Sequence, residues 1–305
     1  MRKDISFKGV FTALVTPFTK KDLLDEEMLE QIIETQIASG ISGLVPCGTT
    51  GESPTLSHDE HDRAIALTVK FANGRVPVIA GTGSNATSEA IRLSRHAQEV
   101  GSDAVLLVNP YYNKPTQKGL FLHFKAIADS VDVPCILYNI KGRTGVNIET
   151  PTVQALSKAC PNIVGVKEAS GSLEQMKSVI DATHGAFHVL SGDDNLCLDL
   201  IELGGDGVIS VGSNICPAYI SRMVKLALGG DMPGARAMEA NLAGFFKACF
   251  YETNPIPIKT AMARYGWCEE SFRLPMCTFE NENNRALLYA ELDKLDSLGA
   301  LMRRI

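Results

Sequence analysis

The sequence predicts an α/β protein, a (β/α)8 TIM barrel followed by a small C-terminal helical domain. Apolar runs rich in Val and Ile recur eight times, beginning near Phe11, Gly43, Val76, Ala104, Pro134, Ile163, Phe187 and Gly207. They start about 20 to 33 residues apart, which is the length of one βα unit. This pattern ends at Gly229-Gly230, so we predict a barrel domain over 1–230 and a helical domain over 231–305.

The segments between the apolar runs carry helical periodicity and helix-end signals. The strongest of these segments cover 25–40, 85–100 and the stretch that starts at Thr150-Pro151. Further helices are predicted at 231–252, 255–266 and 281–305. An open, doubly wound sheet would show the same alternation, but eight runs without an acidic or glycine-rich break favour the closed barrel.

Composition limits the function classes. The chain has 305 residues, of which 45% are hydrophobic and 21% charged, and its net charge is −6. It is neither disordered nor collagen-like, and its charge gives no reason to expect nucleic acid or a membrane surface. No apolar run approaches the ~18 residues of a membrane span. The apolar stretch 10–15 is too short for a signal peptide, so we expect a cytoplasmic protein.

The eight cysteines stand singly, without a C-x-x-C pair, at 47, 135, 160, 197, 216, 249, 268 and 277. This spacing indicates neither a disulfide framework nor a metal site. Two histidines at His58 and His61 lie i and i+3 apart, but no further ligand stands at a known metal spacing. Residues 81–86 match the dinucleotide pattern G-x-G-x-x-A, yet Asp103 precedes the next strand instead of ending it, so we expect a tight βα turn.

In a (β/α)8 barrel the active site lies at the carboxyl ends of the strands. The second predicted strand ends in Gly48-Thr49-Thr50-Gly51-Glu52. Two hydroxyls and backbone N–H groups in such a turn suit a carboxylate. The alternative is an ordinary βα turn in which the threonines cap the following helix.

Tyrosines gather at the ends of the fourth and fifth predicted strands. Tyr111 and Tyr112 follow one, and Tyr138 ends the other, which Arg143 follows within a glycine-flanked loop. Arg143 has the geometry to clamp a carboxylate through two hydrogen bonds. A tyrosine at a strand end also serves as ordinary rim packing, and this alternative stays open.

The sixth predicted strand carries Lys167, which interrupts an otherwise apolar run. Such a lysine usually extends its ammonium to solvent. The alternative is a desolvated amine, partly neutral near neutral pH, that attacks a carbonyl to form a Schiff base. Tyr138 on the preceding strand is placed for the proton transfers that this chemistry needs.

Together these motifs resemble the 4-hydroxy-tetrahydrodipicolinate synthase (dihydrodipicolinate synthase) family, of the pyruvate-dependent class I aldolase group that includes N-acetylneuraminate lyase. The resemblance covers essentially the whole chain. The matching segments are VTP at 15–17, GTTGES at 48–53, PYYNKPTQ at 110–117, YNIKGRTG at 138–145, GVKEASG at 165–171, SGDD at 191–194, GVISV at 207–211 and NPIPIK at 254–259.

The resemblance implies a lyase that joins pyruvate to L-aspartate 4-semialdehyde, the first committed step of diaminopimelate and lysine biosynthesis. It implies Lys167 as the Schiff-base lysine and Tyr138 as its acid/base. Thr49 and Tyr112 would complete the proton relay, with Tyr112 reaching in from a neighbouring subunit. It further implies no cofactor and a homotetramer.

The substrate residues implied by the resemblance are Thr50 for the pyruvate carboxylate, Arg143 for the carboxylate of the aldehyde, and Ile209. An effector site for L-lysine is implied at Ser53, His58, His61, Asn85, Glu89 and Tyr111. Two positions depart from the common family pattern, namely Lys141 in place of proline and Pro54 in place of alanine.

Two other functions are weighed against this one. One is a sister aldolase acting on a keto-deoxy sugar acid, although such members tend to lack the arginine at 143. The other is an inactive relative that binds a keto acid as a sensor, against which the joint presence of Lys167, Tyr138, Thr49 and Tyr112 argues.

Overall fold

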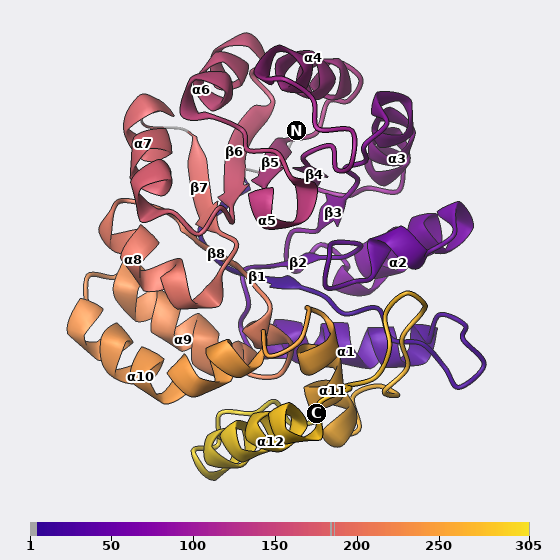
Figure 1. Ribbon diagram of the computed structural model, residues 1–305, viewed down its shortest axis with the longest axis vertical. Helices are drawn as coiled ribbons and strands as arrows, with labels where there is room; N and C mark the ends of the chain where they lie inside the picture. The colour runs from indigo at the N-terminus through magenta and orange to yellow at the C-terminus, as the bar shows by residue number, and fades with distance from the viewer. Residues whose placement is uncertain (1–4, 184, 186, 305) are drawn as a thin grey trace.

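Figure 1 shows the computed structural model, which describes residues 5–183, 185 and 187–304. Within these residues eight parallel strands form the centre, namely β1 (Gly9–Ala13), β2 (Gly43–Val45), β3 (Ile79–Gly81), β4 (Ala104–Val108), β5 (Cys135–Asn139), β6 (Ile163–Glu168), β7 (His188–Ser191) and β8 (Gly207–Ser210). They pair in the order β2-β1-β8-β7-β6-β5-β4-β3, and a parallel bridge between Leu44 and Val78 joins the two ends. The predicted barrel is therefore confirmed, and the open sheet is excluded.

Helices surround the strands, as Figure 1 shows. They are α1 (Glu26–Ala38), α2 (His58–Ala72), α3 (Thr87–Glu99), α4 (Gln117–Ala128), α6 (Thr150–Ala159), α7 (Leu173–Thr183), α8 (Cys197–Glu202) and α9 (Pro217–Leu228). Short helical turns follow several strands, namely η1 (Ser53–Thr55), α5 (Lys141–Thr144), η2 (Asp194–Leu196) and η3 (Gly212–Asn214). The helix α2 begins at a capping box, in which Ser57 and Glu60 satisfy each other's backbone N–H.

Three more helices follow the barrel, namely α10 (Met232–Ala248), α11 (Ile256–Arg264) and α12 (Glu282–Ser297). The last was expected to reach residue 305, which is wrong. Gly299, at φ 64°, ends the helix in a left-handed conformation. The chain then turns back, and the Met302 N–H donates to the Ile215 carbonyl at 2.8 Å.

The hydrophobic core has an inner and an outer layer. Inside the barrel lie side chains such as Phe11, Ile136 and Ile209. Between strands and helices, buried residues of α10 and α12 such as Phe245 and Leu288 share one cluster with those of α1 and α9. The C-terminal helices therefore pack on the barrel, beside α1 and α9 (Figure 1). A domain boundary at residue 230 stays a prediction.

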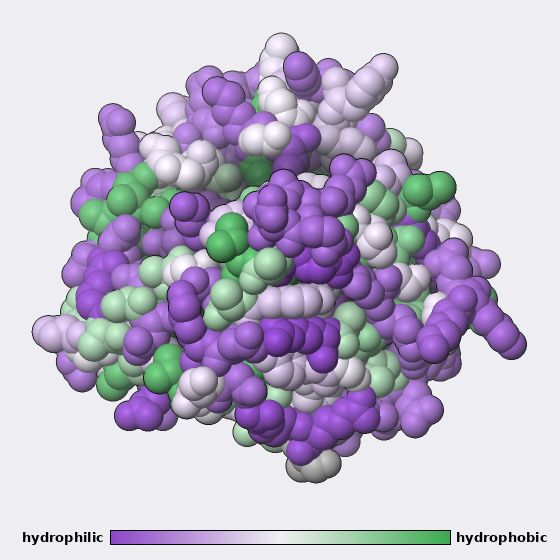
Figure 2. Space-filling model, turned by 60° about the horizontal axis from the view of Figure 1, so that its bottom comes forward, coloured by the Kyte–Doolittle hydropathy of each residue, from purple (hydrophilic) through white to green (hydrophobic). Residues whose placement is uncertain are grey.

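The face of the molecule that Figure 2 shows is mainly polar. Figure 2 turns the lower edge of Figure 1 toward the viewer, and hydrophilic residues dominate this face, with hydrophobic ones in small groups. In the described part of the chain, no helix has the length and apolar character needed to cross a membrane.

Candidate active site

Tyr138 and Lys167 meet inside the barrel, near the carboxyl ends of β5 and β6. They are register partners, and Lys167 is in turn the partner of Leu190 on β7. Register partners in a parallel sheet point to the same face, so the three side chains share the barrel interior. Tyr138 and Lys167 are only 5% and 6% exposed. Lys167 therefore does not extend to solvent, which was the alternative open at the level of sequence.

The amine of Lys167 lies against the ring of Tyr138, with Nζ 4.2 Å from the ring centroid. Gly192, which follows β7, leaves space for this lysine. A Cβ at position 192 would lie 3.0 Å from Cε of Lys167 and 2.5 Å from Cβ of Ala169. A larger residue there would press on the side chain of Lys167 and on Ala169, so glycine leaves room for both.

Two carboxyl groups follow Gly192 and lie near the amine. Burial raises the pKa of both Asp193 and Asp194, while the charge of Lys167 opposes the rise. Asp194 accepts hydrogen bonds from the N–H groups of Val211 and Gly212, at 3.0 and 2.9 Å. This carboxylate therefore ties the end of β7 to the end of β8, close to the predicted substrate residue on that strand.

The residues that follow Tyr138 and Lys167 point outward and hold the strand ends together. Asn139 donates from Nδ2 to both carboxylate oxygens of Glu168, at 3.1 and 3.0 Å. Asn109 at the end of β4 donates to Oδ1 of Asn139 at 3.0 Å. All three of these side chains are fully buried. Because buried polar groups of this kind are satisfied by one another, they fix the backbone that carries the tyrosine and the lysine.

The turn after β2 carries Thr49 and Thr50. It is tight, since the N–H groups of Gly51 and Glu52 bond to the carbonyls of Gly48 and Thr49, each at 3.1 Å. Thr49 is half-buried, and Thr50 is 2% exposed. The hydroxyl of Thr50 accepts a hydrogen bond from Nδ2 of Asn254 at 3.0 Å, which leaves its proton free to donate elsewhere.

Arg143 lies on α5, a short helix that crosses the end of the barrel facing the viewer in Figure 1. The expected glycine-flanked loop is thus a helical turn, closed by Gly145 at φ 73°. Its guanidinium is exposed and donates from Nη2 to the carbonyl of Asn254 at 3.1 Å. Asn254 therefore touches both predicted carboxylate-binding residues, Thr50 and Arg143.

Tyr112 is 90% exposed and, within the described residues, forms no hydrogen bond or ring contact with Tyr138. Its backbone adopts the left-handed conformation at φ 73°, which costs a residue other than glycine roughly 1 to 2 kcal/mol. A single chain therefore holds Lys167, Tyr138, Thr49, Thr50 and Ile209 around one barrel end but leaves Tyr112 outside it.

The predicted effector residues divide into two groups. His58 on α2 contacts Glu89 on α3, with 2.8 Å between Nε2 and Oε1. Hydrogen bonds from Ser84 and His58 hold the pKa of Glu89 below its usual value. His61 is buried instead, and burial lowers its pKa to about 4.

The other effector positions lie in neighbouring loops. Nδ2 of Asn113 donates to the carbonyl of Asn85 at 2.8 Å, and its backbone N–H donates to the carbonyl of Tyr111 at 2.9 Å. Asn113 therefore joins the loops that carry Asn85 and Tyr111, while Ser53 begins η1 after the threonine turn.

The glycines of the G-x-G-x-x-A segment have a packing role. A Cβ at Gly81 would lie 2.3 Å from the carbonyl oxygen of Cys47, and one at Gly83 would lie 2.2 Å from the nitrogen of Val108. These glycines allow backbones to approach closely around β3, which supports the interpretation as a βα turn.

Sequence reasoning missed three residues that support this site, namely Glu52, Asn254 and Lys259. Asn254 and Lys259 lie in the NPIPIK segment, so their family motif was visible but their contacts were not. Lys259 is fully buried. The sequence hints at this burial only in that Lys259 interrupts a largely apolar stretch at 255–263.

Comparison with known proteins agrees with the fold and the motifs. The model of the dihydrodipicolinate synthetase family matches residues 6–292. A 4-hydroxy-tetrahydrodipicolinate synthase of Endomicrobium trichonymphae is 53% identical over 281 residues, which is 92% of this chain and 96% of the relative.

Two solved structures that are similar to this chain contain a bound ligand. A dihydrodipicolinate synthase of Acinetobacter baumannii, solved in complex with pyruvate, is 43% identical with a TM-score of 0.93, covering 95% of this chain and 99% of that one. The enzyme of Cyanidioschyzon merolae, solved with lysine bound, is 39% identical with a TM-score of 0.92, covering 95% and 98%. With a family match over nearly its whole length and a relative identical at more than half of the aligned positions, this chain belongs to the dihydrodipicolinate synthetase family.

Proposed function

We propose that this chain is a lyase that condenses pyruvate with L-aspartate 4-semialdehyde to give 4-hydroxy-tetrahydrodipicolinate. The observation that carries the proposal is the buried amine of Lys167, 4.2 Å from the ring of Tyr138 at the catalytic end of the barrel. The relatives described above bear the name of this synthase, and one was solved with pyruvate. None of them favours the sugar-acid aldolase.

The first half of the reaction uses Lys167 as the nucleophile. Its amine adds to the ketone carbon of pyruvate, and the adduct loses water to give an imine. Tyr138 supplies and removes the protons, with Thr49 and the partner copy's tyrosine at 112 completing the relay. The imine draws electrons from the neighbouring methyl group, which loses a proton to give an enamine. Because the imine is itself the electron sink, we propose that the reaction needs no metal or organic cofactor.

The second half joins the two substrates. The enamine carbon attacks the aldehyde, and the imine re-forms. The amino group of the former semialdehyde then adds to the imine carbon and displaces the amine of Lys167, which closes the ring. Thr50 would hold the pyruvate carboxylate, Arg143 the second carboxylate, and Ile209 would pack against the bound pyruvate. Contact of both Thr50 and Arg143 with Asn254 supports this arrangement of the two carboxylates.

We propose a homotetramer in which a neighbouring copy covers Tyr112. The side chain is 90% exposed on an unfavourable backbone conformation, which supports a use outside its own chain. We also retain a cytoplasmic location as a prediction.

We propose further that L-lysine binds near Ser53, His58, Asn85, Glu89 and Tyr111, with His61 buried on the same helix as His58. The carboxylate of Glu89 suits the ammonium group of an amino acid, and its present partner His58 lies at the start of the helix after the threonine turn. The lysine-bound relative supports this assignment.

The direct test supplies both substrates to the purified chain and identifies the products by mass spectrometry. We expect the cyclic product only when pyruvate and the semialdehyde are both present. Absence of that product, together with cleavage of a keto-deoxy sugar acid, would replace the proposal by its alternative.

A further inference from the structure

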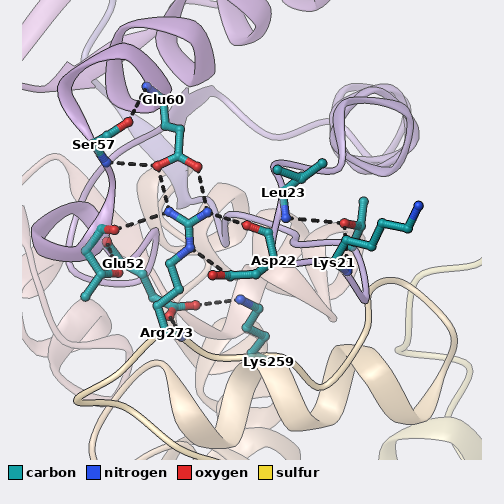
Figure 3. Close-up of polar contacts among 10 residues, drawn as sticks. Lys21, Asp22, Leu23, Glu52, Ser57, Glu60, Lys259 and Arg273 are labelled. Atoms are coloured by element: carbon teal, nitrogen blue, oxygen red, sulfur yellow. Dashed lines mark hydrogen bonds and ion pairs between the residues drawn. The ribbon is translucent and has the colours of Figure 1, made fainter.

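Glu52 and Lys259 form an ion pair that is closed to solvent. Oε1 of Glu52 lies 2.5 Å from Nζ of Lys259, and the two side chains are 1% and 0% exposed. The partners are 207 residues apart in the sequence. Figure 3 shows that the pair joins the turn after β2 to the helix α11.

The surroundings of the pair hold its geometry. Nζ of Lys259 lies 4.2 Å from the ring centroid of Phe18 and 5.3 Å from that of Phe272. The backbone N–H of Arg273 donates to the second carboxylate oxygen of Glu52 at 3.3 Å. Burial lowers the pKa of Lys259, and the nearby carboxylate of Glu52 opposes this effect.

Arg273 extends the same cluster outward. Its guanidinium donates to Glu60 of the α2 capping box and to the carbonyl of Thr55, and it pairs with Asp22 (Figure 3). Arg273, from the C-terminal part of the chain, therefore binds the segment that follows the turn of Thr49 and Thr50 at several points.

The position of Glu52 determines the position of the two threonines. Glu52 adopts the left-handed conformation at φ 53°, as does Cys47 at φ 55°, so two unfavourable residues flank the turn. The N–H of Glu52 donates to the carbonyl of Thr49 at 3.1 Å. A side chain that fixes Glu52 therefore fixes Thr49 and Thr50 as well.

We propose that Lys259 is a positioning residue, which acts through Glu52 to hold Thr50 against the pyruvate carboxylate and Thr49 in the proton relay. This inference rests on the proposed function. The turn is held from two points of this segment, since Asn254, just before α11, bonds to the hydroxyl of Thr50, and Lys259 on α11 pairs with Glu52. Lys259 is not a second Schiff-base lysine, because its amine is fully buried and paired.

The test is a double-mutant comparison based on Lys259→Met, which removes the charge and keeps the length of the side chain. We expect the pyruvate KM to rise roughly tenfold and kcat to fall, because small displacements of substrate-holding groups are costly. In a Thr50→Ala background the same change adds no further rise in the pyruvate KM, since the group it positions is gone.

Arg264→Met is the matched control. Arg264 lies on the same helix but pairs with Asp293 of α12, 2.8 Å away, and we expect the pyruvate KM to stay unchanged. Thermal midpoints of all variants separate loss of folding from loss of positioning. If Lys259→Met does not fold, Glu52→Gln is compared in the same two backgrounds.

If Lys259→Met raises the pyruvate KM equally in the wild-type and Thr50→Ala backgrounds, the inference is overturned, and the ion pair is purely structural. An unchanged KM in folded Lys259→Met would overturn it too. The proposed function is tested separately, by whether the wild-type chain forms the cyclic product. That result does not depend on the variants.

Discussion

Replacing Gly192 by alanine tests whether the space beside Lys167 matters for the reaction. The added Cβ would lie 2.5 Å from Cβ of Ala169 and 3.0 Å from Cε of Lys167, whereas ordinary contact begins at 3.4 Å. Overpacking of this kind costs about 1 to 3 kcal/mol. Because Cε carries the amine, relief of this contact moves the nucleophile by a few tenths of an ångström, whereas a displacement of about 1 Å at a reacting group costs roughly 100-fold. We therefore expect imine formation to slow by roughly 3- to 10-fold.

The assay traps the pyruvate imine with borohydride at timed intervals and weighs the protein, and thermal midpoints show whether the variant is folded. Gly142→Ala is the matched control, because a Cβ at Gly142 meets nothing within 4 Å and the residue also lies at the mouth of the barrel. A wild-type trapping rate in Gly192→Ala would refute this reasoning, as would an equal loss in both variants.

Three further outcomes are expected. Arg143→Ala weakens use of the semialdehyde by about 1.5 to 3 kcal/mol, the value of hydrogen bonds to a charged group, and spares imine trapping with pyruvate, as steady-state and trapping rates will show. Arg273→Met flattens the acid side of the stability profile, because the hydrogen bond from Arg273 is the main cause, ahead of those from Ser57, that lowers the pKa of Glu60 to about 2 from 4.5. The contribution of Arg273, roughly 1 kcal/mol after solvent screening, is present above pH 4.5 and lost as pH falls toward 2, which urea unfolding across pH will show. L-Lysine binds in calorimetry with pyruvate present, and Glu89→Ala with Tyr111→Phe abolishes the heat.

For each of these three predictions, a different result would contradict it. Parallel loss of pyruvate trapping in Arg143→Ala would make the arginine structural. An unchanged acid profile in Arg273→Met would mean that the guanidinium does not stabilise the ionised form of Glu60 in the folded protein. Binding of L-lysine that survives both substitutions would move the effector site elsewhere.

The strands could be predicted because parallel strands are buried on both faces and therefore appear as continuous apolar runs. The starts of β2, β4, β6 and β8 coincide with the predicted residues. Lys167 stood out for the same reason, since it breaks such a run. The strand predicted from Val76 begins only at Ile79, because 76–78 approach β2 with irregular backbone bonds around Pro77.

Long-range pairs could not be predicted, because neither partner carries a local signal of the other. The sequence places Glu52 in a turn and Lys259 in a helix, and only the fold shows that the two side chains lie 2.5 Å apart. Asn254 likewise reaches Thr50 across 204 residues. The end of α12 was missed although Gly299, a helix-ending residue, stands in the sequence, while the bond of the tail to Ile215 has no local signal.

The central claim is that Lys167 is the nucleophile, and one measurement tests it most directly. Pyruvate and borohydride are added to the wild-type chain and to Lys167→Ala, and the proteins are weighed and digested to locate the adduct. We predict one reduced pyruvate adduct per chain, on Lys167, and none in the variant. An adduct on another lysine, or an undiminished adduct in Lys167→Ala, would contradict the account.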